Sequence, residues 1–153
     1  MKSNYIEGVF RSKWLSKFIS KGSIKGNKFK LEKFLYFSFF ELKKNFVLSP
    51  LFLFFEALEK LKPSVGLKIY TQGNSKKKRV KACPILLNFC SQYTKALYWM
   101  LKAIQLRTDL FFHVKIYNEL ENITLNESVN HMKMKKEYYN YAIIFKSAKR
   151  FNW

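Results

Sequence analysis

The sequence predicts a mainly α fold: a single helical domain of about six helices, with one β-hairpin inserted between the third and fourth helices. Three observations predict it. Apolar residues recur at helical spacing over most of the 153-residue chain. Residues 65–84 instead alternate apolar and polar residues on either side of a turn signal. With 48% hydrophobic residues, a chain of this length can bury one core. We expect residues 1–11 to form an N-terminal extension and residues 12–153 to form the domain.

The first two helices are predicted from caps and periodicity. Ser12 suits an N-cap, Gly22 suits a C-terminus, and the residues between them place three apolar side chains at helical spacing, Leu15, Phe18 and Ile19. The linker "SIKGNK" follows. A second helix, ending near Phe46, then carries one face made of Leu31, Phe34, Leu35, Ser38 and Leu42.

The third helix has the clearest signals in the chain. Ser49 is a capping residue, Pro50 suits the first turn, and Pro63 stops the helix. Its expected buried face consists of Leu51, Phe55, Leu58 and Leu61. Two acid–lysine pairs occur at helical spacing, Glu56 with Lys60 and Glu59 with Lys62.

The hairpin and three further helices complete the expected fold. The alternating strings "VGLKIYT" and "KRVKACPI" are separated by the turn-forming "QGNS". The fourth helix should bury Phe89, Tyr93, Leu97, Met100, Leu101 and Ile104. A fifth helix is expected after a Thr108 cap, with Leu110, Val114 and Tyr117 on one face. A sixth is indicated by Tyr138, Tyr141, Ala142, Phe145 and Ala148.

The charge implies a polyanionic partner, either nucleic acid or an anionic membrane surface. The net charge is +19, from 29 Lys and Arg against 10 acids, and self-repulsion of this size disfavours a free globular state. No acid occurs between Glu59 and Asp109, a region that contains eleven cations. The densest basic runs are "KKKR" at 76–79 and "KMKK" at 133–136, with Lys25 and Lys28 in the first linker. Lysines neutralise phosphates, and Tyr or Trp can stack on unpaired bases.

Enzymatic chemistry is not indicated. His113 and His131 fall on different expected helices, and Glu119 and Glu121 are spaced so that they point to different helix faces. The sequence contains no Gly-rich phosphate loop, nucleophile elbow or metal-ligand spacing. Two cysteines seven residues apart, Cys83 and Cys90, match no zinc or redox pattern. The sequence therefore predicts a binding protein with no cofactor and no metal site. It also predicts no membrane span, because Glu41, two lysines and Pro50 interrupt the most apolar region.

Several strings, in this order of elements, resemble one protein family. They are "KFISKGSIKGNK" at 17–28, "FEALEKLKP" at 55–63, "ALYWMLKAIQLR" at 96–107, "NEL" at 118–120, and the ending "KMKKEYYNYAIIFKSAKRFNW". Glu32, Tyr36, Val65 and Lys68 fall in step with them. Over residues 12–153 the chain resembles small-subunit ribosomal protein seven of bacteria and organelles.

The resemblance implies a structural constituent of the small ribosomal subunit. Such a protein binds the 3′ major domain of small-subunit rRNA and organises assembly of the head. It lies near exit-site tRNA and the mRNA exit channel, beside other small-subunit proteins of the head and platform. Matching positions imply rRNA contacts at Lys17, Lys21, Lys28, Lys68, Lys133 and Lys135. Charge and placement add Lys25, Lys76, Lys77, Lys78, Arg79 and Lys136. In the family the hairpin carries paired arginines before a double glycine, whereas here "KKKR" follows "IYTQGN".

The expected location is the mitochondrial matrix, within the small ribosomal subunit. Lys, Phe, Tyr, Asn and Ile are abundant and have AT-rich codons, which suggests an organellar genome. The chain also leaves little room for a cleaved presequence, which favours synthesis inside an organelle. A plastid or the bacterial cytoplasm is the alternative location.

Two other classes of function remain open. One is a generic basic DNA- or RNA-binding architectural protein, which would bind plain duplex as well as structured rRNA. The other is a peripheral membrane protein at an anionic surface, which would require an exposed amphipathic helix. The apolar helix faces are needed for the core, so we expect no membrane partner.

Overall fold

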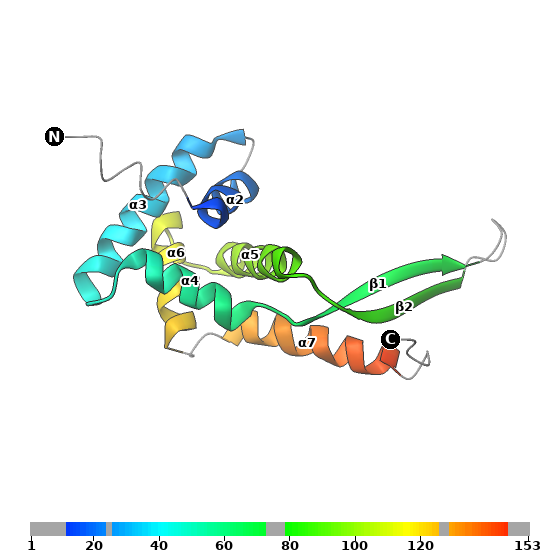
Figure 1. Cartoon of the computed structure of the whole chain (residues 1–153). Helices are drawn as coiled ribbons and strands as arrows, with labels where there is room; N and C mark the ends of the chain where they lie inside the picture. The colour runs from blue at the N-terminus through cyan, green and yellow to red at the C-terminus, as the bar shows by residue number, and fades with distance from the viewer. Residues whose placement is uncertain (1–11, 24–25, 73–78, 126–128, 147–153) are drawn as a thin grey trace.

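The computed structural model describes residues 12–23, 26–72, 79–125 and 129–146. In these segments six helices and two strands follow one another in the order α2 (Lys13–Gly22), α3 (Lys28–Asn45), α4 (Pro50–Leu61), β1 (Val65–Gln72), β2 (Arg79–Leu86), α5 (Phe89–Leu106), α6 (Phe112–Thr124) and α7 (Val129–Lys146) (Figure 1). The predicted mainly α fold is confirmed, and the hairpin lies between the third and fourth helices.

The two strands form an antiparallel hairpin that extends away from the helices, with α7 running alongside its base (Figure 1). The pairing runs from Val65 opposite Leu86, beside the helices, to Gln72 opposite Arg79 at the far end. At the base, Leu87 N donates to Ser64 O at 3.0 Å. A Cβ at Gly66 would lie 2.4 Å from Leu87 Cδ2, so glycine permits this close approach.

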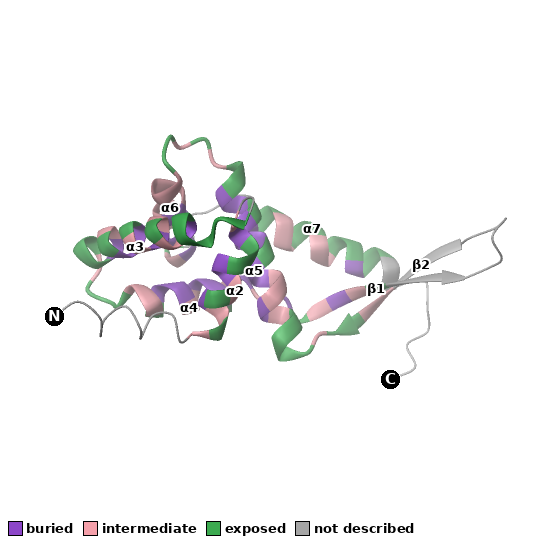
Figure 2. Ribbon diagram, turned by 90° about the horizontal axis from the view of Figure 1, so that it is seen from above, coloured by how far each residue is buried: buried purple, intermediate pink, exposed green. Residues whose placement is uncertain are grey.

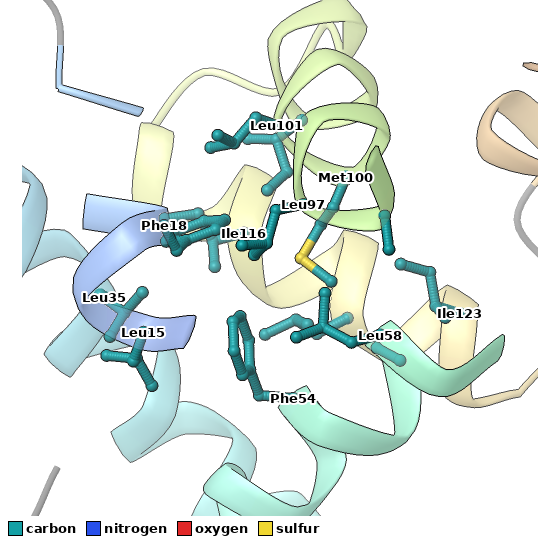
Figure 3. Close-up of a cluster of buried hydrophobic side chains, with 14 of the residues drawn as sticks. Leu15, Phe18, Leu35, Phe54, Leu58, Leu97, Met100, Leu101, Ile116 and Ile123 are labelled. Atoms are coloured by element: carbon teal, nitrogen blue, oxygen red, sulfur yellow. The ribbon is translucent and has the colours of Figure 1, made fainter. Parts of the chain in front are cut away.

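The core lies between the helices (Figure 2). Phe18 of α2, Phe54 of α4, Met100 of α5 and Ile116 of α6 meet at its centre, each at most 1% exposed (Figure 3). Among the side chains whose burial is described, no hydrophobic residue of the hairpin is buried. The hairpin is therefore an arm mounted on a helical body, and the core ends at its base.

Side-chain caps set the starts of α3 and α4. The Ser49 hydroxyl accepts from Phe52 N at 3.3 Å and Pro50 occupies the first turn, as the sequence predicts. Asn27 caps α3 by accepting from Lys30 N at 3.2 Å, directly after Gly26 with its positive φ of 77°. Ser12 precedes α2, but its side chain makes no capping hydrogen bond.

The prediction for the buried face of α4 is wrong in part. Leu58 and Leu61 are buried as expected, but Leu51 and Phe55 are only partly buried. The remaining buried positions of the helix are Leu53, Phe54 and Ala57. Most residues in the first half of α4 are apolar, so periodicity alone admits more than one face, and the faces that pack against α5 and α6 decide the orientation.

Four other details of the later helices differ from expectation. Phe89 is 60% exposed although it begins α5, and Tyr141 on α7 is 57% exposed beside buried Ala142. Helix α6 begins at Phe112 with Phe111 at the N-cap, so Thr108 is no cap, and Leu110 is 89% exposed. The reason for the later start of α6 is a competing contact on either side of Thr108, in which Arg107 Nε donates to Asp109 Oδ2 at 2.9 Å. Ala148 lies outside the described residues.

Within the described segments, no helix combines the length and the apolar character that crossing a membrane would require.

Candidate nucleic-acid interface

Three of the predicted RNA-binding lysines lie where α2 gives way to α3. Lys17 and Lys21 are one turn apart on α2, and Lys28 is the first residue of α3. Lys21 and Lys28 are exposed, while Lys17 is half-buried with its Nζ 4.9 Å from the centroid of the Trp14 ring. Lys25 lies outside the described residues. The described part of this connection therefore presents cations to solvent from both helices.

The hairpin carries the second group. Lys68 is exposed on β1, opposite Cys83 of β2. Arg79 begins β2 and pairs with Gln72 at the end of the hairpin far from the helices. Lys76, Lys77 and Lys78 precede it in the sequence and lie outside the described residues.

Helix α7 carries the third group. Lys133 and Lys136 are exposed, which leaves their ammonium groups accessible to an anion. Lys135 differs, because it is half-buried and its Nζ donates to Lys60 O at 2.7 Å, in the last turn of α4. A cation at this position satisfies a terminal carbonyl and complements the helix dipole, so Lys135 helps to join α7 to α4.

Two tyrosines on α7 hold the base of the hairpin. The Tyr138 hydroxyl accepts a hydrogen bond from Leu67 N of β1 at 2.9 Å and another from Lys95 Nζ of α5. The Tyr139 hydroxyl accepts from Ser64 N at 3.1 Å. The Tyr138 ring also packs edge-on against Trp99, with centroids 5.3 Å apart. These contacts connect the arm to α5 and α7, and sequence reasoning missed them because it treated Tyr138 only as part of an apolar helix face.

A buried polar network joins α5, α6 and α7. Glu119, 1% exposed, accepts from Arg107 Nη1 at 2.7 Å through Oε2, while its Oε1 lies 3.2 Å from His131 Nδ1. Glu121 points elsewhere and accepts from the Tyr117 hydroxyl at 3.0 Å, which confirms the prediction that the two glutamates occupy different faces. Arg107 and Glu119 each lie in a string that carries the family resemblance, but no spacing rule connects them with His131.

The charges in this network indicate a structural role, which is to join the three helices. Burial, with a smaller contribution from the charge of Lys135, lowers the pKa of His131 to about 4, so the imidazole is neutral at pH 7. The hydrogen bond from Arg107 holds the pKa of Asp109 below its usual value. In the described part of the chain, no three His, Cys, Asp or Glu residues are grouped so that they could hold a metal ion.

Fold and surface together define a class: a helical, strongly basic protein with a projecting hairpin. Residues 2–144 match the family model described as ribosomal protein S7p/S5e. The chain belongs to this family. The resemblance inferred from the sequence is thereby confirmed, and family membership makes the chain a structural ribosomal protein and not an enzyme.

Relatives with the same family name span nearly the whole chain. Small ribosomal subunit protein uS7 of Wigglesworthia glossinidia brevipalpis is 28% identical over 144 residues, covering 94% of this chain and 89% of the relative. The protein of the same name from Sulfurimonas denitrificans is 26% identical over 145 residues, or 95% of this chain and 90% of the relative. That of Mesoplasma florum is 23% identical over 145 residues, with the same two shares.

Proposed function

We propose that this chain is a structural constituent of the small ribosomal subunit that binds the 3′ major domain of small-subunit rRNA. Its role is to organise assembly of the head, beside neighbouring ribosomal proteins of the head and platform. The names of its relatives, small ribosomal subunit protein, support the assignment to this subunit. The contacts we propose are made by the first-helix and linker lysines, the hairpin and the lysines of α7.

The observation that carries the proposal is the separation of acids from exposed lysines. Glu119 and Asp109 are engaged by Arg107, and Glu56 and Glu59 by lysines of their own helix. Lys21, Lys28, Lys133 and Lys136 are meanwhile all exposed. Cations whose charge is not cancelled locally attract phosphates and release counterions when they bind them, which favours an RNA partner.

The shape of the hairpin supports the finer assignment near exit-site tRNA and the mRNA exit channel. Each strand has eight residues, so the arm is about 25 Å long at the usual rise per residue. An arm of this length can follow an RNA backbone beyond the helical body. The rRNA contact depends on several surfaces, whereas the tRNA and mRNA assignments depend on the hairpin alone.

The RNA-binding proposal is tested by charge neutralisation with a matched control. In the test variant Lys76, Lys77, Lys78 and Arg79 become Gln. In the control the exposed α3 residues Lys30, Lys33, Lys43 and Lys44 become Gln, which removes the same charge. Binding to a transcript of the 3′ major domain is measured from low to moderate salt.

We expect the hairpin variant to bind the transcript more weakly and its affinity to depend less on salt. The slope of log affinity against log salt concentration should fall by about 1 for each phosphate that is no longer neutralised. The α3 control should change the slope much less. Equal effects of the two variants would contradict a specific role for the hairpin. Equal affinity of the unmodified chain for plain duplex DNA and for the rRNA fragment would favour a generic architectural protein instead.

For location we propose the mitochondrial matrix, with a plastid or the bacterial cytoplasm as the alternative. The abundance of amino acids with AT-rich codons supports an organelle. The relatives named above are bacterial. Lysates of purified mitochondria are sedimented through a high-salt gradient and the chain is followed by mass spectrometry. Migration with the small subunit, at near-equal stoichiometry to its rRNA, is the expected result. Its absence from mitochondrial fractions would contradict this location, and a chain left at the top of the gradient would contradict the ribosomal role.

A further inference from the structure

Three aromatic rings from two distant parts of the chain lie in contact beside the base of the hairpin, one pair stacked and the other tilted. Trp14 of α2 stacks on Tyr93 of α5, with centroids 4.9 Å apart and an angle of 23° between the planes. Phe89, the first residue of α5, lies against Tyr93 with centroids 4.5 Å apart and an angle of 46°. The three rings together are called the ring stack below.

Lysines from two helices surround the ring stack. Lys17 Nζ lies 4.9 Å and Lys13 Nζ 6.0 Å from the centroid of Trp14, both on α2. Lys62 Nζ, from the end of α4, lies 5.5 Å from the centroid of Tyr93. These distances are within the range of cation–π interactions. Three elements therefore bring cations and rings together at one place.

The rings of the ring stack differ in their exposure to solvent. Tyr93 is 5% exposed and contacts both of the other rings, whereas Phe89 is 60% exposed. Phe89 is thus a large apolar ring that is positioned by a buried neighbour and remains open to solvent.

We propose that the ring stack is a stacking site for an unpaired base of the rRNA, which would lie on the exposed ring of Phe89. The surrounding lysines would neutralise the phosphates on either side of that base. This inference rests on the proposed RNA-binding function and adds a specific contact to it. Base–aromatic stacking tolerates any base, so the site contributes affinity for single-stranded RNA and little sequence preference.

Charge favours a nucleotide over a protein side chain at this site. Of the three surrounding lysines, only Lys62 has a salt bridge among the described residues, with Glu59 one turn earlier in α4. An apolar protein partner would have to leave the cations on α2 uncompensated. A nucleotide satisfies both parts of the site, because its base has a π-face and its backbone has negative charge.

The chain offers a matched control for the test. Phe40 on α3 is 61% exposed and carries one lysine, Lys44, whose Nζ lies 4.5 Å from its centroid. It resembles Phe89 in exposure, but among the described residues no second ring stacks against it. Phe40→Ala therefore removes an equal ring outside the proposed site.

The experiment compares Phe89→Ala, Phe89→Leu, Phe89→Tyr and Phe40→Ala in the full chain. The first probe is a twelve-nucleotide oligoadenylate, and the second is an abasic backbone of the same length. We expect Phe89→Ala and Phe89→Leu to bind oligoadenylate about tenfold more weakly, with an unchanged salt slope. Phe89→Tyr should retain affinity for oligoadenylate, and Phe40→Ala should bind it as the unmodified chain does. No ring variant should change binding to the abasic probe.

A lysine variant tests the proposed phosphate contacts separately from the stacking contact. Lys17→Gln should flatten the salt slope on both probes, because it removes a phosphate contact rather than a stacking contact. Thermal unfolding of each variant checks that the fold is retained, and Phe89→Leu keeps most of the apolar contact with Tyr93 if alanine destabilises α5. Equal binding of Phe89→Leu and the unmodified chain to oligoadenylate would overturn the stacking site alone. Failure of the unmodified chain to bind any RNA would overturn the proposed function together with it.

Discussion

Arg107 Nη1 lies 2.7 Å from Glu119 Oε2 and joins the end of α5 to the buried face of α6. The Glu119 side chain is 1% exposed and that of Arg107 18% exposed, so most of the pair is removed from water. Arg107 also binds Asp109 in the connection between the two helices. One guanidinium thus holds both the turn and the helix that follows it.

Arg107→Ala should destabilise the fold strongly, because it leaves the buried carboxylate of Glu119 without its cation. We expect the free energy of unfolding to fall by about 3 kcal/mol. Chemical denaturation of the two proteins measures the difference. Glu59→Gln is the control, since its pair with Lys62 is partly exposed, and it should change stability by less than about 1 kcal/mol. Similar losses in both variants would contradict a special role for the buried pair.

Acid should destabilise the protein through His131. The pKa of His131 is about 4 in the folded chain, below its ordinary value of 6.5, because of burial. Between these two values the unfolded state binds more protons than the folded state, so stability is fully present above pH 6.5 and is lost as the pH falls toward 4. The loss should amount to at most about 3 kcal/mol.

The measurement is the free energy of unfolding at several pH values across that interval, for the unmodified chain and for His131→Gln. The variant removes the titrating group, so its stability should depend less on pH in this window. The lowered pKa of Asp109 acts in the same direction, but mainly below the ordinary value of 3.8 for that carboxyl group. Parallel curves for the two proteins between pH 4 and 6.5 would assign the acid sensitivity to other groups.

Tyr138→Phe should loosen the base of the hairpin without unfolding the helices. It removes the acceptor of the Leu67 amide and of Lys95 while keeping the ring that packs on Trp99. We expect amide hydrogen exchange at Leu67 to accelerate roughly fivefold to tenfold, in line with a destabilisation of about 1 kcal/mol. Tyr141→Phe, an exposed position on the same helix, should leave exchange at Leu67 unchanged. Equal exchange in all three proteins would mean that the hydrogen bond does not hold the strand.

Ser49→Ala should lower the free energy of unfolding by about 1 kcal/mol, because it removes the cap on α4. Ser12→Ala at the start of α2 is the matched control, because its side chain makes no capping hydrogen bond. Thermal melts of the two variants compare the same chemical change at two helix starts. A larger shift for Ser12→Ala would contradict the cap assignment.

Local signals predicted the elements well where a residue acts on its own neighbours. The Ser49–Pro50 start and the stop before Pro63 needed only the backbone chemistry of those residues, and both are present. The change from helical to alternating period near Val65 likewise predicted the hairpin. The Thr108 cap was wrong because Arg107 and Asp109 pair across that position, and a helix signal in the sequence does not include this competing contact.

The candidate site could be predicted only as a set of charges. Lys21, Lys28, Lys133 and Lys136 are exposed, as a phosphate-binding residue requires. Lys135 came from the same basic run but donates to Lys60 O, and its half-buried position depends on how α7 packs against α4. The charge of a residue follows from its type, whereas its partner depends on which element lies opposite.

The sequence by itself determined the helical class, the order of the elements, the position of the hairpin, the excess of positive charge and the family resemblance. Each of these depends on residue type or on spacing within a few turns of chain. The tertiary structure alone decided which face of α4 is buried and how Arg107, Glu119 and His131 meet. It also decided the stacking of Trp14 on Tyr93 and the anchoring of Leu67 by Tyr138. These contacts join residues far apart in the chain. They are determined by the packing of whole helices, because that packing minimises exposed apolar surface and unpaired buried polar groups.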